Sequence, residues 1–194
     1  MESRDPYTAG HQHRVSVLAS AIARELRIPE HEVQGIFFAS VIHDIGKIRV
    51  PSDILSKPGK LTLIEFELIK SHVQAGYDIV KGIDFPWPVA DMILQHHERL
   101  DGSGYPNGLR SEAILPGAKI RAVADVAEAM MSHRPYRAAL GLDRALAEIE
   151  EGKGRLFDPA AVDACLDLFR RQRFTFEEPL PSVPSSAHET AQHA

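Results

Sequence analysis

Cysteine is nearly absent from the sequence: Cys165 is the only one in 194 residues, so no intramolecular disulfide can form. That usage suits a reducing compartment, and we expect the protein in the cytoplasm. The apolar neighbours of Cys165 predict a small core residue on a helix rather than a reactive thiol. No stretch approaches the ~20 consecutive apolar residues of a membrane span, and the first residues lack the apolar segment of a signal peptide.

Positive charge is also in short supply: 22 Lys and Arg stand against 27 Asp and Glu, for a formal net charge of -5. This balance argues against general attraction to a nucleic-acid polymer or an anionic membrane. An anionic ligand must then be attracted locally, by a metal ion or by a few placed cations. Hydrophobic residues make up 44% of the chain and charged residues 25%, which is typical of a globular protein.

An alternating strand pattern is also missing, whereas apolar residues recur at helical spacing along most of the chain. The periodicity predicts helices over residues 13–26, 29–43, 62–72, 89–97, 118–131, 142–150 and 159–170. Thr62 with Glu65 three positions later forms a capping box, and Asp158 is a suitable N-cap for the last helix. We therefore expect an all-α, compact multi-helix bundle. Residues 177–194 are rich in proline and serine and are predicted to be a disordered tail.

Histidine is a residue type that the sequence does have in number, with ten copies. His188 and His193 fall in the tail, and His31 lies in a polar helix start. His13 points to the opposite helix face from His11. For these separate reasons none of the four is expected in a site. The histidines on or at the ends of apolar helices are His11, His43, His72, His96 and His97.

Two carboxylates accompany these imidazoles in apolar surroundings. Asp44 follows His43 at the end of a predicted helix, and Asp125 lies inside the helix over 118–131. A buried carboxylate is costly unless it is paired or bound to a metal, and for Asp125 a nearby Arg or Lys is the alternative partner. A carboxylate can also bridge two ions. Together these side chains suit a two-metal site, and their mixed donors favour Fe or Mn, or else Zn or Ni, over Mg.

Five stretches of the sequence carry a family resemblance. They are RDPYTAGH over 4–11, HDIGKI over 43–48, QHHERLDGSGYP over 95–106, ADV over 124–126 and RPYR over 134–137. In combination they resemble the HD-GYP domains, a branch of the HD metal-dependent phosphohydrolases. The resemblance implies an HD-domain-like bundle over residues 4–173, in which a glycine-rich loop lies beside a buried binuclear metal site.

The resemblance also implies an activity. HD-GYP proteins are bacterial phosphodiesterases that hydrolyse cyclic di-GMP to pGpG or GMP, by attack of a metal-activated hydroxide on phosphorus. By this likeness Asp44 would be the bridging carboxylate and Lys47 would reach the scissile phosphate. The remaining implied roles are a first metal on His11, His43, Asp44 and Asp125, a second on His72, His96 and His97 with Asp44 shared, and substrate contacts from Arg134, Arg137, Gly104, Tyr105 and Pro106.

Three positions depart from the family pattern. Some members carry a glutamate four residues before the first metal histidine and use it for a third metal, but this chain has Tyr7 there. We therefore expect two metals rather than three. His133 stands where Asp is common, and Met131 where Thr is common. Neither change removes an expected metal ligand, although each can alter substrate contacts.

Two alternatives to a cyclic di-GMP phosphodiesterase stay open at this point. One is a catalytically silent module that binds cyclic dinucleotides or docks on cyclase (GGDEF) domains through the loop around Tyr105. The other is an HD hydrolase of another nucleotide, including other cyclic dinucleotides. Further expected associations are an upstream sensory or receiver module and a homodimer.

Overall fold

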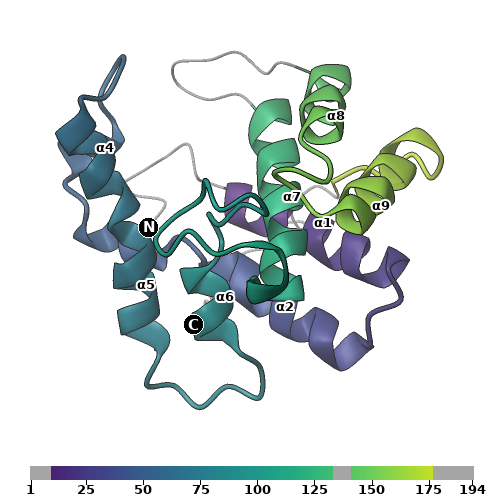
Figure 1. Ribbon diagram of the computed structural model, residues 1–194, viewed down its shortest axis with the longest axis horizontal. Coiled ribbons are helices and arrows are strands. Elements are labelled where there is room, and N and C mark those ends of the chain that lie inside the picture. Colours follow the sequence, from purple (N-terminus) through teal and green to yellow (C-terminus); the bar gives the residue numbers. More distant parts are fainter. Residues whose placement is uncertain (1–9, 133–140, 177–194) are drawn as a thin grey trace, which may run out of the picture.

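Figure 1 shows the computed structural model, which describes residues 10–132 and 141–176. Within these ranges the regular structure is helical and the strand-like contacts are isolated bridges, so the all-α prediction is confirmed. The first segments are α1 (His11–Glu25), α2 (Glu30–Ile42), the 3-10 helix η1 (Ile45–Arg49), α3 (Ser52–Leu55), α4 (Leu63–Lys70) and α5 (His72–Val80). They are followed by α6 (Val89–Leu94), the 3-10 helix η2 (Ser111–Ala113), α7 (Pro116–Met131), α8 (Leu142–Glu151) and α9 (Pro159–Arg170).

The bundle is built around α1, which packs against α2 and α7. Ala19 and Ala23 of α1 and Ala124 and Ala127 of α7 are fully buried, and such small side chains allow two helices to approach closely. On the other flank α5 packs against η1 and α6. In Figure 1, α4 and α5 form one edge of the molecule, while α8 and α9 lie toward the opposite edge. The start of α1 lies beside the C-terminal half of α7, where His11 contacts Asp125 and Glu128.

Local sequence signals are confirmed where they are strongest. Thr62 Oγ1 accepts a hydrogen bond from Glu65 N at 3.3 Å, and Thr62 N donates to Glu65 Oε2 at 2.7 Å, which completes the capping box of α4. Asp158 Oδ1 accepts from Ala161 N at 3.0 Å and caps α9 as expected. Cys165 is fully buried on α9, as its apolar neighbours predict.

Two predicted helix ends are wrong. The helix expected over 62–72 stops at Lys70, and His72 begins a new helix, α5, instead of ending the earlier one. Ser71 Oγ donates to Leu68 O at 2.6 Å, a side-chain bond that competes with the helical pattern at this junction. The helix expected over 89–97 stops at Leu94. Gln95 O instead accepts from Glu98 N at 3.0 Å, so a tight turn replaces the last turn of the expected helix.

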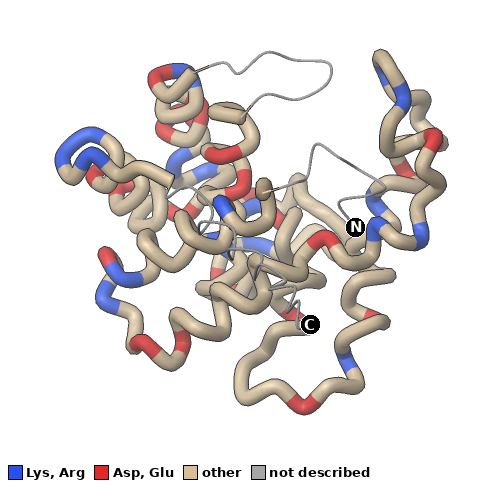
Figure 2. Tube along the Cα trace, turned by 180° about the vertical axis from the view of Figure 1, so that it is seen from behind, with Lys and Arg blue, Asp and Glu red and all other residues tan. Residues whose placement is uncertain are grey.

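The charges of the described residues are mixed in sign along the trace, with acidic and basic positions interspersed (Figure 2). No helix in this part of the chain is both long enough and apolar enough to cross a membrane.

At the C-terminal end of the described residues, Phe174 and Phe176 pack against Phe169 of α9, with ring centroids 5.3 and 6.3 Å from it. The domain limits at residues 4 and 173 stay predictions, and the expected tail over 177–194 lies outside the described residues.

Candidate metal centre

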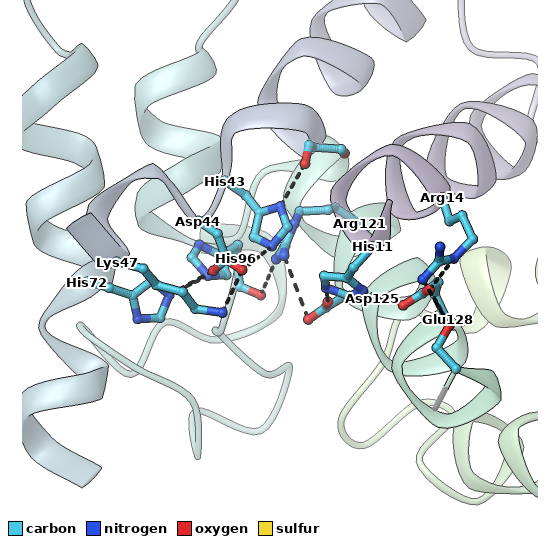
Figure 3. A network of polar contacts seen from close by, with 12 residues as sticks. His11, Arg14, His43, Asp44, Lys47, His72, His96, Arg121, Asp125 and Glu128 are labelled. Atoms are coloured by element: carbon cyan, nitrogen blue, oxygen red, sulfur yellow. Dashed lines mark hydrogen bonds and ion pairs between the residues drawn. The ribbon is translucent and has the colours of Figure 1, made fainter. Parts of the chain in front are cut away.

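The side chains that the sequence singles out as metal ligands converge where several helix ends meet α7. His11 is the first residue of α1, His72 is the first of α5, and Asp125 lies in α7. His43 and Asp44 directly follow α2, and His96 and His97 follow α6 after one intervening residue. Figure 3 shows that His43, Asp44, His72 and His96 point toward one another.

The potential donor atoms form two groups. His72, His96 and His97 offer atoms that all lie within 4.8 Å of one another, and so do His11, His43 and Asp125. Asp44 lies between the groups, because its Oδ1 is 3.4 Å from His72 Nε2 and its Oδ2 is 3.2 Å from His43 Nε2. The structure therefore brings together all seven residues that the sequence indicated, in two groups with Asp44 between them, while their roles as metal ligands stay predictions.

Backbone carbonyls fix the orientation of three of the imidazoles. Nδ1 of His43 lies 2.6 Å from Ser40 O, Nδ1 of His72 lies 2.6 Å from Ile69 O, and Nδ1 of His96 lies 2.5 Å from Ile93 O. Since a carbonyl oxygen only accepts, each Nδ1 carries the hydrogen and each Nε2 presents a lone pair to the centre of the site.

Two of those lone pairs face each other at close range. His72 Nε2 and His96 Nε2 are 3.2 Å apart, and with both hydrogens on Nδ1 neither nitrogen can donate to the other. The pair of lone pairs repels unless a cation or a proton lies near both. The donor chemistry of this group therefore fits a metal ion.

Burial keeps the imidazoles in the form that binds metal. His43, His72 and His96 are each about 1% exposed or less. Desolvation is the largest influence on His43 and His96 and lowers the pKa of both, so their rings are neutral near pH 7. Burial of Asp44 opposes its ionisation, yet His43 and Lys47 hold the pKa of this carboxyl well below its usual range. Neutral imidazoles around ionised carboxylates are the set that a divalent cation requires.

Two buried charged residues of α7 were missed by the sequence reasoning. Arg121 is 2% exposed, donates from Nη1 to His96 O at 3.2 Å, and places Nη2 3.7 Å from Asp125 Oδ2. Glu128 is fully buried and contacts His11. The available signal was the one that drew attention to Asp125, namely a charged residue in an otherwise small and apolar helix. Their spacing of four and three residues from Asp125 puts all three on one helix face.

A model of the HD domain matches residues 1–161 of the chain. The chain belongs to the HD domain family. Its His43–Asp44 and Gly104–Tyr105–Pro106 motifs, together with its curated relatives, assign it to the HD-GYP branch.

Among the curated relatives of this HD-GYP domain is the "Cyclic di-GMP phosphodiesterase response regulator RpfG" of Xanthomonas campestris pv. campestris (strain 8004). It is 46% identical over 168 residues, which are 86% of this chain and 44% of the relative. The "3'3'-cGAMP-specific phosphodiesterase 3" of Vibrio cholerae serotype O1 (strain ATCC 39315 / El Tor Inaba N16961) is 39% identical over 87% of this chain and 37% of its own length. The chain thus spans less than half the length of these two relatives.

A solved structure shares the fold of the HD-GYP domain. It is described as "Bd1817, a HDG"Y"P protein from Bdellovibrio bacteriovorus" and superposes with a TM-score of 0.67 over 82% of this chain and 51% of that one. Sequence identity is 22%, so the likeness concerns the fold alone. The prediction of an HD-domain-like helical bundle is confirmed.

The glycine-rich loop of the HD-GYP domain packs directly on a candidate ligand. The ring of Tyr105 lies 4.7 Å from the ring of His97, centroid to centroid. Gly104 is required by close approach, because a Cβ there would lie 2.4 Å from both His97 O and Glu98 Cα. Glu98, which is 2% exposed, accepts from Asn107 N at 2.8 Å and thereby holds the far side of the loop. Tyr105 therefore packs against His97 and holds its ring in place. The expected contacts of Gly104, Tyr105 and Pro106 with substrate stay predictions.

Lys47 lies at the rim of the site, where its Nζ donates to Asp44 Oδ2 at 2.6 Å. The Lys47 side chain is 22% exposed, whereas the side chain of Asp44 is 3% exposed. Met131 is the half-buried last residue of α7. The other residues that the sequence drew attention to, Tyr7, His133, Arg134 and Arg137, lie outside the described residues.

Metal binding to the HD-GYP domain is expected to displace a proton from His11. Burial disfavours the charged ring, but Asp125 and Glu128 outweigh it, and the pKa of His11 is raised from 6.5 to about 9 in the metal-free protein. Near neutral pH the imidazolium must therefore lose about one proton before Nε2 can ligate. Apparent affinity is expected to rise with pH until this pKa is passed.

Calorimetric titration of metal-free protein with Zn²⁺ in buffers of different ionisation enthalpy measures the protons released. His31→Gln, at an exposed position, is the control and is expected to release as many protons as the unsubstituted protein. Proton release that does not decline as the pH passes about 9 would contradict this account of His11.

Proposed function

We propose that this HD-GYP domain is a metal-dependent phosphodiesterase that hydrolyses cyclic di-GMP to pGpG or GMP. The observation that carries the proposal is the pair of donor groups joined by Asp44, in the interior of a fold whose curated relatives include a cyclic di-GMP phosphodiesterase. A scaffold without catalysis has no need of seven converging ligands, and this favours an enzyme over a silent docking module.

The proposed ligand assignment follows the two donor groups. His11, His43 and Asp125 would hold one ion with Asp44, and His72, His96 and His97 would hold the other, with Asp44 shared. Imidazole and carboxylate donors in this proportion suit Fe or Mn, with Zn or Ni as further possibilities. A third ion is not expected, because Tyr7 replaces a glutamate ligand.

The proposed reaction joins the oxygen of a water to phosphorus and breaks the bond from phosphorus to the 3′ oxygen, which takes up a proton. When bound, two divalent cations lower the pKa of a shared water and neutralise phosphate oxygens. Asp44 contributes an ionised carboxylate between the donor groups. Lys47 adds a positive charge at the rim, where an anionic phosphodiester approaches a chain whose net charge is -5. Arg134 and Arg137 are proposed to clamp the phosphate through their guanidinium groups.

A panel of nucleotides tests the proposal. Protein purified without oxygen, reduced and loaded with Fe²⁺ or Mn²⁺, is expected to linearise cyclic di-GMP, and mass spectrometry of the products distinguishes pGpG from GMP. Elemental analysis of the same sample establishes how many ions each chain carries. If the protein carries its full complement of metal and turns over no nucleotide, the proposed enzymatic activity is refuted. The alternative of a catalytically silent binding module would then be favoured.

A second substrate class has support of its own, because a relative that matches 87% of this chain is named for 3'3'-cGAMP. The panel therefore includes 3'3'-cGAMP and cyclic di-AMP beside cyclic di-GMP, each at equal concentration. A higher kcat/KM for 3'3'-cGAMP would move the assignment to that messenger without changing the proposed chemistry.

The proposal also covers partner proteins, oligomeric state and location. The loop around Tyr105 is a proposed contact for GGDEF-domain proteins, and the partial coverage of the relatives is compatible with an upstream sensory or receiver module. A homodimer and a cytoplasmic location complete the proposal. No nucleic-acid polymer is expected as a partner, because the described charges are mixed in sign.

A further inference from the structure

His11 differs from three other candidate ligands in how its ring is held. His43, His72 and His96 each direct Nδ1 to the carbonyl of the residue three positions earlier, in the helix that precedes them. His11 is the first residue of α1, so no turn of its own helix precedes it. Its N-cap residue, Gly10, has no side chain that could contribute an acceptor. A ring in this place needs an acceptor from elsewhere in the fold.

Glu128 of α7 supplies that acceptor. Its Oε2 contacts His11 Nδ1, while its Oε1 accepts from Arg14 Nε at 2.6 Å and from Ser132 Oγ at 2.5 Å. Glu128 is fully buried, so its carboxylate contacts residues of α1 and the C-cap of α7 rather than solvent. Figure 3 shows Glu128 and Arg14 on the side of His11 that faces away from the other candidate ligands.

The other ring nitrogen of His11 faces the site. His11 Nε2 lies 3.2 Å from Asp125 Oδ1, and Asp125 precedes Glu128 by three residues on α7. Residues at this spacing lie on the same helix face, so one face of α7 contacts both nitrogens of the ring. With Glu128 holding a hydrogen on Nδ1, Nε2 is the ring nitrogen that can ligate an ion in the donor group that includes His43 and Asp125.

We propose that Glu128 is a positioning residue, which fixes the tautomer and direction of His11 so that Nε2 ligates the ion held with His43 and Asp125. The proposal rests on the proposed function in requiring a metal at this group, but it concerns affinity rather than turnover. Carboxylates that accept from a ligating histidine in this way commonly change metal affinity by about 10- to 100-fold when they are replaced. The effect is expected at one ion, because the hydrogen bonds and ion pairs of the Glu128 carboxylate go to His11, Arg14 and Ser132 and not to His72, His96 or His97.

A purely structural role is the competing explanation. In that case Glu128 would serve as the buried partner of Arg14 and hold α1 against α7, and the contact with His11 would be incidental. Arg14→Gln separates the two roles, because it removes the ion pair and leaves the carboxylate on His11. Glu128→Gln keeps the shape of the side chain but removes the charged acceptor that both partners share.

The decisive measurement is the affinity of each site for Co²⁺, followed by the visible absorption of the bound ion and by competition with a chelator. Glu128→Gln is expected to weaken one of two sites by about 10- to 100-fold and to change its absorption, while the other site is unaffected. Arg14→Gln is expected to leave both affinities within a few-fold of the unsubstituted protein, because Glu128 keeps its contact with His11 through Oε2. Circular dichroism and thermal unfolding of each variant show whether it is folded.

Two results would overturn the proposal. One is a Glu128→Gln protein that binds both ions with unchanged affinity and absorption. The other is an Arg14→Gln protein that loses as much affinity at the same site, since the ion pair would then be the cause. Failure of the proposed function is distinguishable, because a protein that hydrolyses no cyclic dinucleotide still reports on Glu128 through Co²⁺ binding.

Discussion

Replacing Asp44 with asparagine is expected to reduce hydrolysis of the cyclic dinucleotide by roughly 10³-fold or more. The carboxylate lies between the two donor groups, 3.2 Å from His43 Nε2 and 3.4 Å from His72 Nε2, and it is 2% exposed. Asparagine has a similar shape but no charge and one oxygen fewer, so it cannot link two cations. Loss of two-metal stabilisation is worth several kcal/mol, and each 1.4 kcal/mol is about a factor of ten in rate.

Turnover of the metal-loaded Asp44→Asn protein, with elemental analysis of the same sample, checks this expectation. Asp91→Asn is the matched control, because it makes the same chemical change at an exposed position in the first turn of α6. The control is expected to retain full activity and full metal content. An Asp44→Asn protein that binds two ions and turns over within tenfold of the unsubstituted protein would remove Asp44 from the proposed bridging role.

Replacing Gly46 with alanine is expected to disable the site although no ligand is replaced. A Cβ at this position in η1 would lie 1.9 Å from His72 O and 2.4 Å from Gly76 N. Both are backbone atoms of α5, so no side chain can move aside and η1 must separate from α5 by about 1 Å. That shift moves Asp44 and Lys47 away from His72. A displacement of this size commonly costs about 100-fold in activity, and the forced packing costs about 1–3 kcal/mol of stability.

Chemical unfolding and kcat measured on the Gly46→Ala protein test this. Gly82→Ala is the control, because a Cβ there meets nothing within 4 Å. We expect the control to lie within about 0.5 kcal/mol of the unsubstituted protein and to keep its activity. Equal stability and activity of the Gly46→Ala protein would mean that the contact between η1 and α5 does not set the spacing of the ligands.

The residues predicted best from the sequence are those whose signal is local. Thr62 and Glu65, which lie within four residues of each other, predict the start of α4, and Asp158 predicts the start of α9. The candidate ligands were found in a related way, since His43, Asp44 and Asp125 are polar residues in apolar helical segments. That rule requires only the 3.6-residue period and the cost of burying a charge.

The residues that were missed depend on which helices meet. Glu128 and Arg121 stand out in the sequence as charged residues in an apolar helix, but their partners His11 and His96 are known only once the helices are placed. The start of α5 at His72 was likewise not predicted, because Ser71 changes the local bonding without an apolar or proline signal. The contact of Tyr105 with His97 could not be foreseen from the sequence, because it depends on how the glycine-rich loop folds back on the end of α6.

The distribution of the seven donors over separate segments has a consequence for the whole molecule. Each cation would act as a cross-link, one joining the ends of α1 and α2 to α7, the other joining the start of α5 to the turn after α6, and Asp44 would connect them. Such a link closes long loops of chain that the unfolded state would leave open. Because unfolded chains hold such ions weakly, mass action makes the folded population depend on the concentration of free metal. The ions that do the proposed chemistry would thus also act as ligands that hold the bundle together.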